Sequence, residues 1–460
     1  MFTARLADFV CSTQPSGIPD EVIRRVGMAL IDTVGVALAG SGEPVVDVAL
    51  RQAAAFGGRG EATVLGYDVK LAAPDAAFVN SIAAHILDFD DSLPTLRGHP
   101  SGPVLAAALA AASLSKASGR EFLASYALAV ETGGKLGRVL GHGHYFRGWH
   151  TTATVSVFTS AAAAGRILGL DPPKMRIAFG FAAASAAGLL KSFGTMAKSW
   201  QVGRAAHNGF LAAWLASQGA TASDAVFDGA DGFFGTYSMG DGKPAEEIAE
   251  GIGFDWEILQ PGISFKRWPC CYGAHRAIGG VLQMVQEHDI RPEEVESIDI
   301  GFGPNGDRAL RSRRPKTGLE AKFSFEYPVA AAIIDRAVGF DSFTDARVNR
   351  PQAQRLIHAT RRVQFEGEGV FTAHVGYNDV TIRTRRGDFF KRVSQTPGSP
   401  TWPMSPEEMR AKFLDCAGMV QDAGSAQQLA SALAGIAQAD DVAAVFASQT
   451  KSWRKSPHHR

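Results

Sequence analysis

The chain has 460 residues, more than one hydrophobic core usually serves, so we expect two domains. Its 46 basic and 46 acidic residues cancel, which excludes the electrostatic footprint of a protein that binds nucleic acid or an anionic membrane. The four cysteines are too few and too scattered for a disulfide framework. The most apolar run (177–190) is too short to span a bilayer, and Asp8 lies where a signal peptide would have its apolar core. We therefore expect a soluble, cytoplasmic protein.

The first 260 residues have the pattern of successive helices. Val22, Val26, Leu30 and Val34 recur every fourth residue behind Asp20, which predicts an amphipathic helix with an acidic first turn. Similar patterns predict helices over 73–88, 103–118, 120–141, 151–168, 174–191 and 203–218. Alanine and glycine are abundant in these segments, so we expect close helix–helix packing with several helices buried on most sides.

The pattern changes near residue 263. Apolar and polar residues alternate over 295–301, 362–366 and 379–385, which is typical of half-exposed strands. Helices are expected between them at 274–288, 325–336 and 350–359. Helix returns at Ser405, where Glu408 completes a capping box, and is expected to continue to about residue 446.

This order predicts a mainly α protein with a discontinuous large domain. The all-helical domain would consist of residues 1–262 and 397–460, and the smaller α+β domain of residues 263–396 would be inserted into it.

The segment from His85 to Ser92, followed by 97–102, carries the most chemical information. Asp88, Asp90 and Asp91 stand among apolar residues, and ionised aspartate is seldom buried without a partner. His99 directly precedes a long apolar helix, whose N-terminus attracts anions. A solvated turn between two helices is the alternative; the two imidazoles beside three carboxylates favour a catalytic cleft.

Four more segments concentrate polar groups: 141–150, 192–198, 265–276 and 322–328. Each lysine in them also fits an ordinary solvated surface residue. His142 and His144 lack a neighbouring cysteine or carboxylate, so we expect no metal there. The acidic cluster at Asp88 also suggests a terpene-type cyclase, but a second metal motif and glutamine–tryptophan pairs are absent from the sequence.

Six motifs in this order resemble the MmgE/PrpD family, which includes 2-methylcitrate dehydratase, cis-aconitate decarboxylase and iminodisuccinate epimerase. The motifs are Asp88-Phe-Asp-Asp, His99-Pro-Ser-Gly, Gly148-Trp-His-x-Thr, Gly194-Thr-x-x-Lys, Lys266-Arg-x-Pro-Cys and Ser324-Phe-x-Tyr. The resemblance covers nearly the whole chain. It implies a helical domain with an α+β lid, an active site in the cleft between them, a homodimer, and catalysis with no metal and no cofactor.

The resemblance also implies roles for matching residues. It implies catalytic roles for Asp88, His99, His150 and Tyr327. It implies substrate binding by Ser92, Lys198, Lys266 and Arg267, where either of the last two adjacent cations would face the ligand. The segment from Asp88 to His99 is one residue longer than in decarboxylase-like members, and Ser92 takes the place of their threonine.

These residue types suit a small di- or tricarboxylate substrate. Fixed cations would meet the charge that develops beside a carboxylate, and imidazoles would move protons near neutral pH. We expect a metal-independent lyase, with dehydration of a 2-methylcitrate- or citrate-like substrate first. The alternatives are epimerisation of an iminodisuccinate-like dicarboxylate and cis-aconitate-type decarboxylation, and, from another class, a non-catalytic helical scaffold.

Overall fold

The computed structural model describes residues 1–366 and 372–455. The chain divides into two compact units, which we describe separately. The first unit consists of Met1–Leu189, Ser199–Ile263 and the described part of Ser405–Arg460. The second consists of Leu190–Lys198 and Ser264–Met404. Most of the regular structure is helical, so the prediction of a mainly α protein is confirmed.

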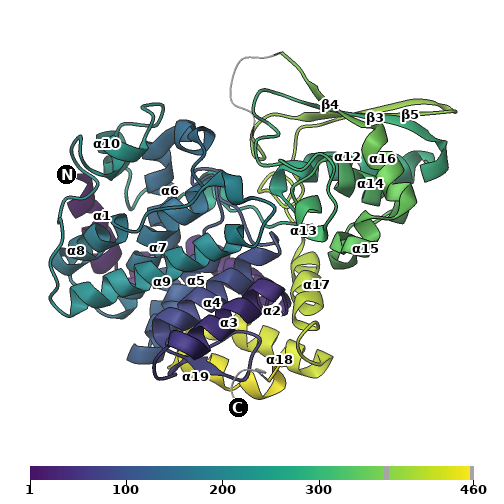
Figure 1. The fold of residues 1–460 in the computed structure, drawn as a ribbon. Coiled ribbons are helices and arrows are strands. Elements are labelled where there is room, and N and C mark those ends of the chain that lie inside the picture. Colours follow the sequence, from purple (N-terminus) through teal and green to yellow (C-terminus); the bar gives the residue numbers. More distant parts are fainter. Residues whose placement is uncertain (367–371, 456–460) are drawn as a thin grey trace. The chain divides into compact units, whose positions relative to one another are not determined.

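The first unit is built from helices (Figure 1). They are α1 (Phe2–Ser12), α2 (Asp20–Gly40), α3 (Pro44–Phe56), α4 (Ala73–Ile86), α5 (Ser101–Ser115), α6 (Gly119–Arg147), α7 (Thr151–Ile167), α8 (Pro172–Ala183), most of α9 (Ala197–Ser217), α10 (Phe233–Tyr237), α11 (Ala245–Glu250), α17 (Pro406–Ala417), α18 (Ala423–Ala434) and α19 (Val442–Ala447). The short strands β1 (Ala62–Thr63) and β2 (Lys70–Leu71) pair antiparallel.

Helix α5 lies at the centre of this unit. Every residue from Ser101 to Ala112 is buried, and α4, α6 and α7 pack around it. Small alanine and glycine side chains permit this close packing, as the sequence predicted. A helix that is apolar on all sides belongs in a core, so α5 gives a rigid base to the segment that precedes it.

The second unit combines a four-stranded sheet with short helices. Its strands are β3 (Val295–Phe302), β4 (Thr360–Gln364), β5 (Asn378–Thr384) and β6 (Gly387–Val393), in the order β4-β3-β5-β6. Only the β3/β4 pair is parallel. The helices are α12 (His275–His288), α13 (Gly318–Ala321), α14 (Glu326–Asp335), α15 (Asp345–Val348) and α16 (Pro351–Ala359). Helices α12 and α16 pack on the sheet, with α14 against both, and form its apolar core.

Several predicted boundaries were wrong, for identifiable reasons. Helix α8 ends at Ala183 and could not run on to 191, because Gly188 takes a left-handed φ of 138° and its carbonyl accepts the His150 N–H. The helix predicted over 120–141 is longer: α6 kinks at Gly141 and continues to Arg147. The region after Ser405 is helical as expected, in the three helices α17, α18 and α19, whereas strand β6 was not predicted. Among the described residues, no helix is long and apolar enough to cross a membrane.

Candidate active site

The loop between α4 and α5 brings the acidic cluster inside the first unit. Helix α4 ends at Ile86, and Asp88 turns the chain with a left-handed φ of 52°. His85, Asp88, Asp90 and Asp91 are all buried. The alternative of a solvated turn is therefore wrong, and these carboxylates need polar partners inside the protein.

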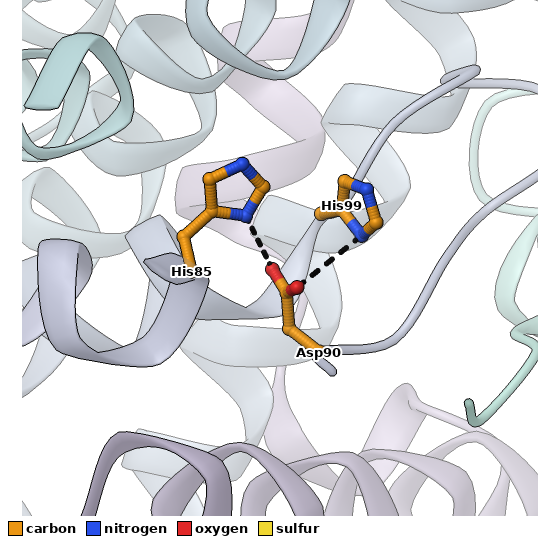
Figure 2. A group of neighbouring side chains, drawn as sticks. All are labelled: His85, Asp90 and His99. Carbon is orange, nitrogen blue, oxygen red and sulfur yellow. Dashed lines mark hydrogen bonds and ion pairs between the residues drawn. The ribbon is translucent and has the colours of Figure 1, made fainter. Parts of the chain in front are cut away.

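One carboxylate joins two imidazoles (Figure 2). The Asp90 Oδ2 lies 2.7 Å from Nδ1 of His85, and Oδ1 lies 3.5 Å from Nδ1 of His99. The two rings meet edge to face, with centroids 4.9 Å apart. Asp90 is completely buried, so its charge acts on these rings with little screening by solvent.

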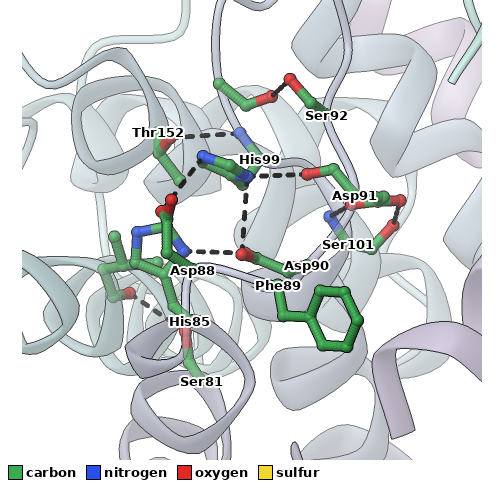
Figure 3. Close-up of polar contacts among 12 residues, drawn as sticks. Ser81, His85, Asp88, Phe89, Asp90, Asp91, Ser92, His99, Ser101 and Thr152 are labelled. Atoms are coloured by element: carbon green, nitrogen blue, oxygen red, sulfur yellow. Dashed lines mark hydrogen bonds and ion pairs between the residues drawn. The ribbon is translucent and has the colours of Figure 1, made fainter. Parts of the chain in front are cut away.

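The hydrogen bonds of His99 fix its tautomer (Figure 3). Its Nδ1 lies 2.7 Å from the backbone carbonyl oxygen of Asp91. A carbonyl only accepts, so Nδ1 carries the proton and the neutral ring presents a lone pair at Nε2. That Nε2 lies 3.9 Å from Oδ1 of Asp88, which would stabilise the imidazolium once Nε2 takes a proton.

His150 brings a third imidazole to the cluster. It stands directly before α7, its ring stacks on that of His85 with centroids 5.7 Å apart, and it is 2 % exposed. Its Nδ1 lies 2.6 Å from Nε2 of Gln201 in α9. No motif in the sequence pointed to Gln201; His85 belongs to the segment singled out in the sequence but was not among the predicted site residues.

Asp91 is tied to the start of α5. The Ser101 hydroxyl donates to its Oδ2 at 2.5 Å, and the Ser101 backbone N–H donates to its Oδ1 at 3.3 Å. Burial, with the nearby charges of Asp32 and Asp90, raises the pKa of Asp91 to about 8 despite these bonds. Asp91 therefore carries a proton at neutral pH and serves to hold the loop rather than to move protons.

Lys412 in α17 supports the same loop. Its Nζ donates to the backbone oxygen of Phe89 at 3.0 Å, lies 3.8 Å from the centroid of the Phe89 ring, and pairs with Oδ1 of Asp32 at 2.7 Å. All three side chains are buried. A lysine on the buried face of a C-terminal helix is the sequence signal that could have indicated this contact.

Arg97 fastens the far end of the loop to α6. Its φ is 54°, and its guanidinium donates to the backbone oxygen of Gly137 at 2.7 Å and to Nδ1 of His142 at 2.8 Å. Burial and the Arg97 charge lower the pKa of His142 to about 4. Burial likewise lowers the pKa of His144 to about 4, and its Nε2 contacts Thr154. His142 and His144 thus form structural contacts.

The residues predicted to bind substrate differ in their burial and in their contacts. Ser92 belongs to the same loop and donates weakly to the oxygen of Gly98 at 3.4 Å. In the second unit, Lys266 is completely buried and the adjacent Arg267 is exposed.

Two further predicted residues lie in the second unit. The Nζ of Lys198 lies 5.2 Å from the ring centroids of both Phe193 and Phe323. The Tyr327 hydroxyl donates to the backbone oxygen of Ser342, and burial raises its pKa to about 12. Tyr327 is therefore a neutral hydroxyl, consistent with hydrogen-bond donation and not with service as a base.

Within the described chain, His85, Asp90 and His99 are the group whose side chains offer three metal-ligand atoms within 4.8 Å of one another. The bond from His99 Nδ1 to Asp91 means that this nitrogen carries a proton, which a metal would have to displace. The group as it stands places one carboxylate between two imidazoles, hydrogen-bonded to His85 and 3.5 Å from Nδ1 of His99. Imidazoles held in this way can transfer protons near neutral pH.

Comparison with known proteins identifies the family. Residues 4–246 match the model of the MmgE/PrpD N-terminal domain, and residues 268–436 match that of the MmgE/PrpD C-terminal domain. The chain belongs to the MmgE/PrpD family, as its motifs suggested.

Its relatives include cis-aconitate decarboxylases and a decarboxylase-like protein. The cis-aconitate decarboxylase of Homo sapiens is 28% identical over 407 residues, which cover 86% of this chain and 83% of that protein. The cis-aconitate decarboxylase of Aspergillus terreus is 24% identical over 465 residues, 96% of this chain and 94% of its own length. The cis-aconitate decarboxylase-like protein oryM of Aspergillus oryzae is 26% identical, over 97% of this chain and 96% of its own length.

Proposed function

We propose that this protein is a lyase that removes a carboxyl group from a small unsaturated tricarboxylate of the cis-aconitate type. The observation that carries the proposal is the buried cluster of His85, Asp90 and His99, in a chain that matches decarboxylases over most of their length. The relatives support decarboxylation better than the dehydration that the sequence placed first, so we reverse that order.

The chemistry of decarboxylation fits the state of His99. When the carbon–carbon bond to a carboxylate breaks, carbon dioxide leaves and the bonding electrons pass into the conjugated system of the substrate. A proton must then be delivered to carbon. The imidazolium of His99, flanked by Asp88 and Asp90, is positioned to hold that proton on Nε2 and to regain it from water after each turnover.

Dehydration remains the second candidate, on one observation. The neutral form of His99 presents an unprotonated Nε2, which is what abstraction of a proton beside a carboxylate requires. Nε2 of His99 would therefore donate a proton to carbon in decarboxylation and accept a proton from carbon in dehydration. Epimerisation of a dicarboxylate would also begin with this abstraction.

Incubation in D₂O with cis-aconitate, 2-methylcitrate and iminodisuccinate, followed by NMR, separates the three reactions. The expected result is loss of carbon dioxide from cis-aconitate, with one solvent deuteron on a carbon of the product. Loss of water from 2-methylcitrate with no turnover of cis-aconitate would replace this proposal by the dehydratase. Exchange without net conversion would identify an epimerase.

Two controls connect the activity to the cluster. His99→Ala should abolish turnover, whereas His358→Ala, which changes an exposed histidine of α16, should leave it unchanged. Activity should also survive exhaustive dialysis against EDTA, because Nδ1 of His99 is engaged by a proton and not by a metal. Loss on dialysis, with recovery on addition of a divalent cation, would contradict metal-independent catalysis.

A further inference from the structure

The side-chain amide of Gln201 has one orientation because it bonds to both the backbone N–H and the backbone carbonyl of Leu189. Its Oε1 accepts the N–H of Leu189 at 3.0 Å, and its Nε2 donates to the carbonyl oxygen of the same residue at 3.2 Å. A backbone N–H cannot accept and a carbonyl cannot donate, so exchange of the amide oxygen and nitrogen would break both bonds. The identity of each amide atom is therefore fixed by the backbone.

This orientation determines the protonation of His150. The Nε2 of Gln201 lies 2.6 Å from Nδ1 of His150, and an amide nitrogen only donates. Nδ1 must accept, so the neutral ring carries its proton on Nε2. Protonation of Nδ1 would place two donors face to face, which disfavours the imidazolium.

The two predicted histidines thus hold opposite tautomers. The backbone carbonyl of Asp91 keeps the proton of neutral His99 on Nδ1. The carboxylates of Asp88 and Asp90 would stabilise the positive charge that the ring gains when Nε2 is protonated. His150 stacks on His85, and its Nδ1 accepts a hydrogen bond from Gln201. A ring kept neutral with an N–H at Nε2 suits donation of a hydrogen bond to developing negative charge.

We propose that Gln201 is a positioning residue that keeps His150 neutral with its proton on Nε2, so that His150 donates a hydrogen bond to the substrate while His99 transfers the proton. The tautomer follows from the hydrogen bonds alone. The division of labour between the two histidines rests on the proposed function. Both histidines were predicted to be catalytic, and nothing in the residue pattern distinguished their roles.

The test is long-range ¹H–¹⁵N NMR on protein with labelled histidine, with the His150 signals assigned through His150→Gln. We expect the Nε2–H tautomer across about pH 6 to 8, the range in which an ordinary histidine titrates. Gln201→Glu keeps an acceptor for Leu189 and offers a carboxylate to Nδ1, so it should move the proton to Nδ1 or charge the ring. A wild-type Nδ1–H tautomer, or an unchanged His150 spectrum in Gln201→Glu, would overturn the proposal.

Kinetics test the role separately. Gln201→Glu should lower kcat by about 10²-fold with a small change in KM, because loss of one preorganised donor to developing charge costs about that much. Gln201→Leu removes the donor without adding charge and should lower kcat less. Gln218→Glu, on an exposed glutamine just beyond α9, is the matched control and should change neither spectrum nor rate.

The NMR and kinetic measurements distinguish failure of the proposed function from failure of the proposed role of His150. If no tested substrate is turned over, the proposed function fails while the tautomer is still judged by NMR. Normal kcat in a Gln201→Glu protein whose His150 spectrum has changed would overturn the role of His150. Thermal melting of each variant checks that the fold is retained.

Discussion

Asp90 orients two imidazoles at once, since it contacts Nδ1 of His85 and Nδ1 of His99 through separate oxygens. An ionised carboxylate only accepts, so it favours a proton on both of these nitrogens. The carboxylate also lies 3.5 Å from Nδ1 of His99. Its removal should therefore impair the imidazolium more than it impairs substrate binding.

Asp90→Asn should lower kcat by about 10²-fold or more, the usual contribution of a positioned acid or base, and leave KM within a few-fold of wild type. The amide keeps the shape of the side chain but loses the charge and turns a donor toward an imidazole. Steady-state kinetics give the answer. Asp388→Asn, on an exposed aspartate of β6, is the control, and equal rates in both variants would contradict the assignment.

The raised pKa of Asp91 predicts that the stability of the folded protein depends on pH. Its pKa of about 8 in the folded protein is above the value of about 4 in an unfolded chain. Between these values the folded state holds a proton that the unfolded state has released, so the contribution of Asp91 to stability falls as pH rises from about 4 to 8 and then levels off.

Asp91→Asn should remove this part of the pH dependence, because an amide mimics the protonated acid. Urea unfolding at several pH values would compare the two proteins. We expect the variant to gain stability relative to wild type as pH rises from about 5 to 8. Parallel curves would mean that Asp91 is ionised in the folded state. Subtraction of the two curves removes the separate effect of Glu131, whose pKa burial also raises to about 8.

At this scale the sequence identified groups but not their contacts. Asp88 and His99 stood out because titratable residues interrupt apolar sequence, and His150 stood out through the family motif Gly148-Trp-His-x-Thr. Gln201 did not, since a single glutamine in a helix is ordinary and its partner His150 lies 51 residues away. Tautomers depend on backbone carbonyls and amide orientation, which residue spacing does not encode.

At the scale of elements, the loop between α4 and α5 is held by three helices. Ser101 of α5 binds Asp91, Lys412 of α17 binds the Phe89 carbonyl, and α6 lies directly against Thr95. A Cβ at Gly137 would stand 2.2 Å from the Thr95 oxygen. The absence of a side chain at this position allows the loop to lie on the helix.

Gly137→Ala should therefore destabilise the protein by about 1–3 kcal/mol, the usual cost of overpacking, and lower kcat by displacing the loop that carries His99. Chemical denaturation and kinetics measure the two effects. Gly27→Ala in α2 is the matched control: nothing lies within 4 Å of the added Cβ, so stability should stay level or rise by up to about 1 kcal/mol. Equal behaviour of the two variants would refute the close contact.

Helices were easier to predict than their ends. The apolar periodicity of 151–168 and 203–218 located α7 and most of α9. The predicted helix over 174–191 was too long: α8 ends at Ala183, and Gly188 beyond it accepts the backbone N–H of His150, a tertiary contact. The kink of α6 at Gly141 also involves a tertiary contact, because the carboxylate of Asp241 would lie 2.4 Å from a Cβ at this position.

At the scale of the whole molecule, the predicted site residues are divided between the two units. The first unit contains Asp88, His99 and His150, and the second contains the buried Lys198 and Lys266 that were predicted to bind substrate. Both sets could be named from the sequence because each motif is local in the chain.

Lys266→Met should raise KM for a tricarboxylate about 10- to 100-fold, since a hydrogen bond to a charged group contributes about 1.5–3 kcal/mol. A ground-state contact of this kind should affect KM at least as much as kcat. Lys391→Met, on a partly exposed lysine of β6 that pairs with Glu287, serves as control. Unchanged KM in Lys266→Met would show that this lysine does not bind substrate.

The contact between Lys412 and Phe89 has a consequence for biosynthesis. These residues are 323 positions apart, so the support beneath the histidine loop comes from a helix that is translated long after the loop itself. Closing so long a separation is entropically costly and slow compared with local helix formation. On the ribosome, the loop between α4 and α5 would lack the contact with Lys412 until α17 emerges, so its full support should be acquired late in synthesis.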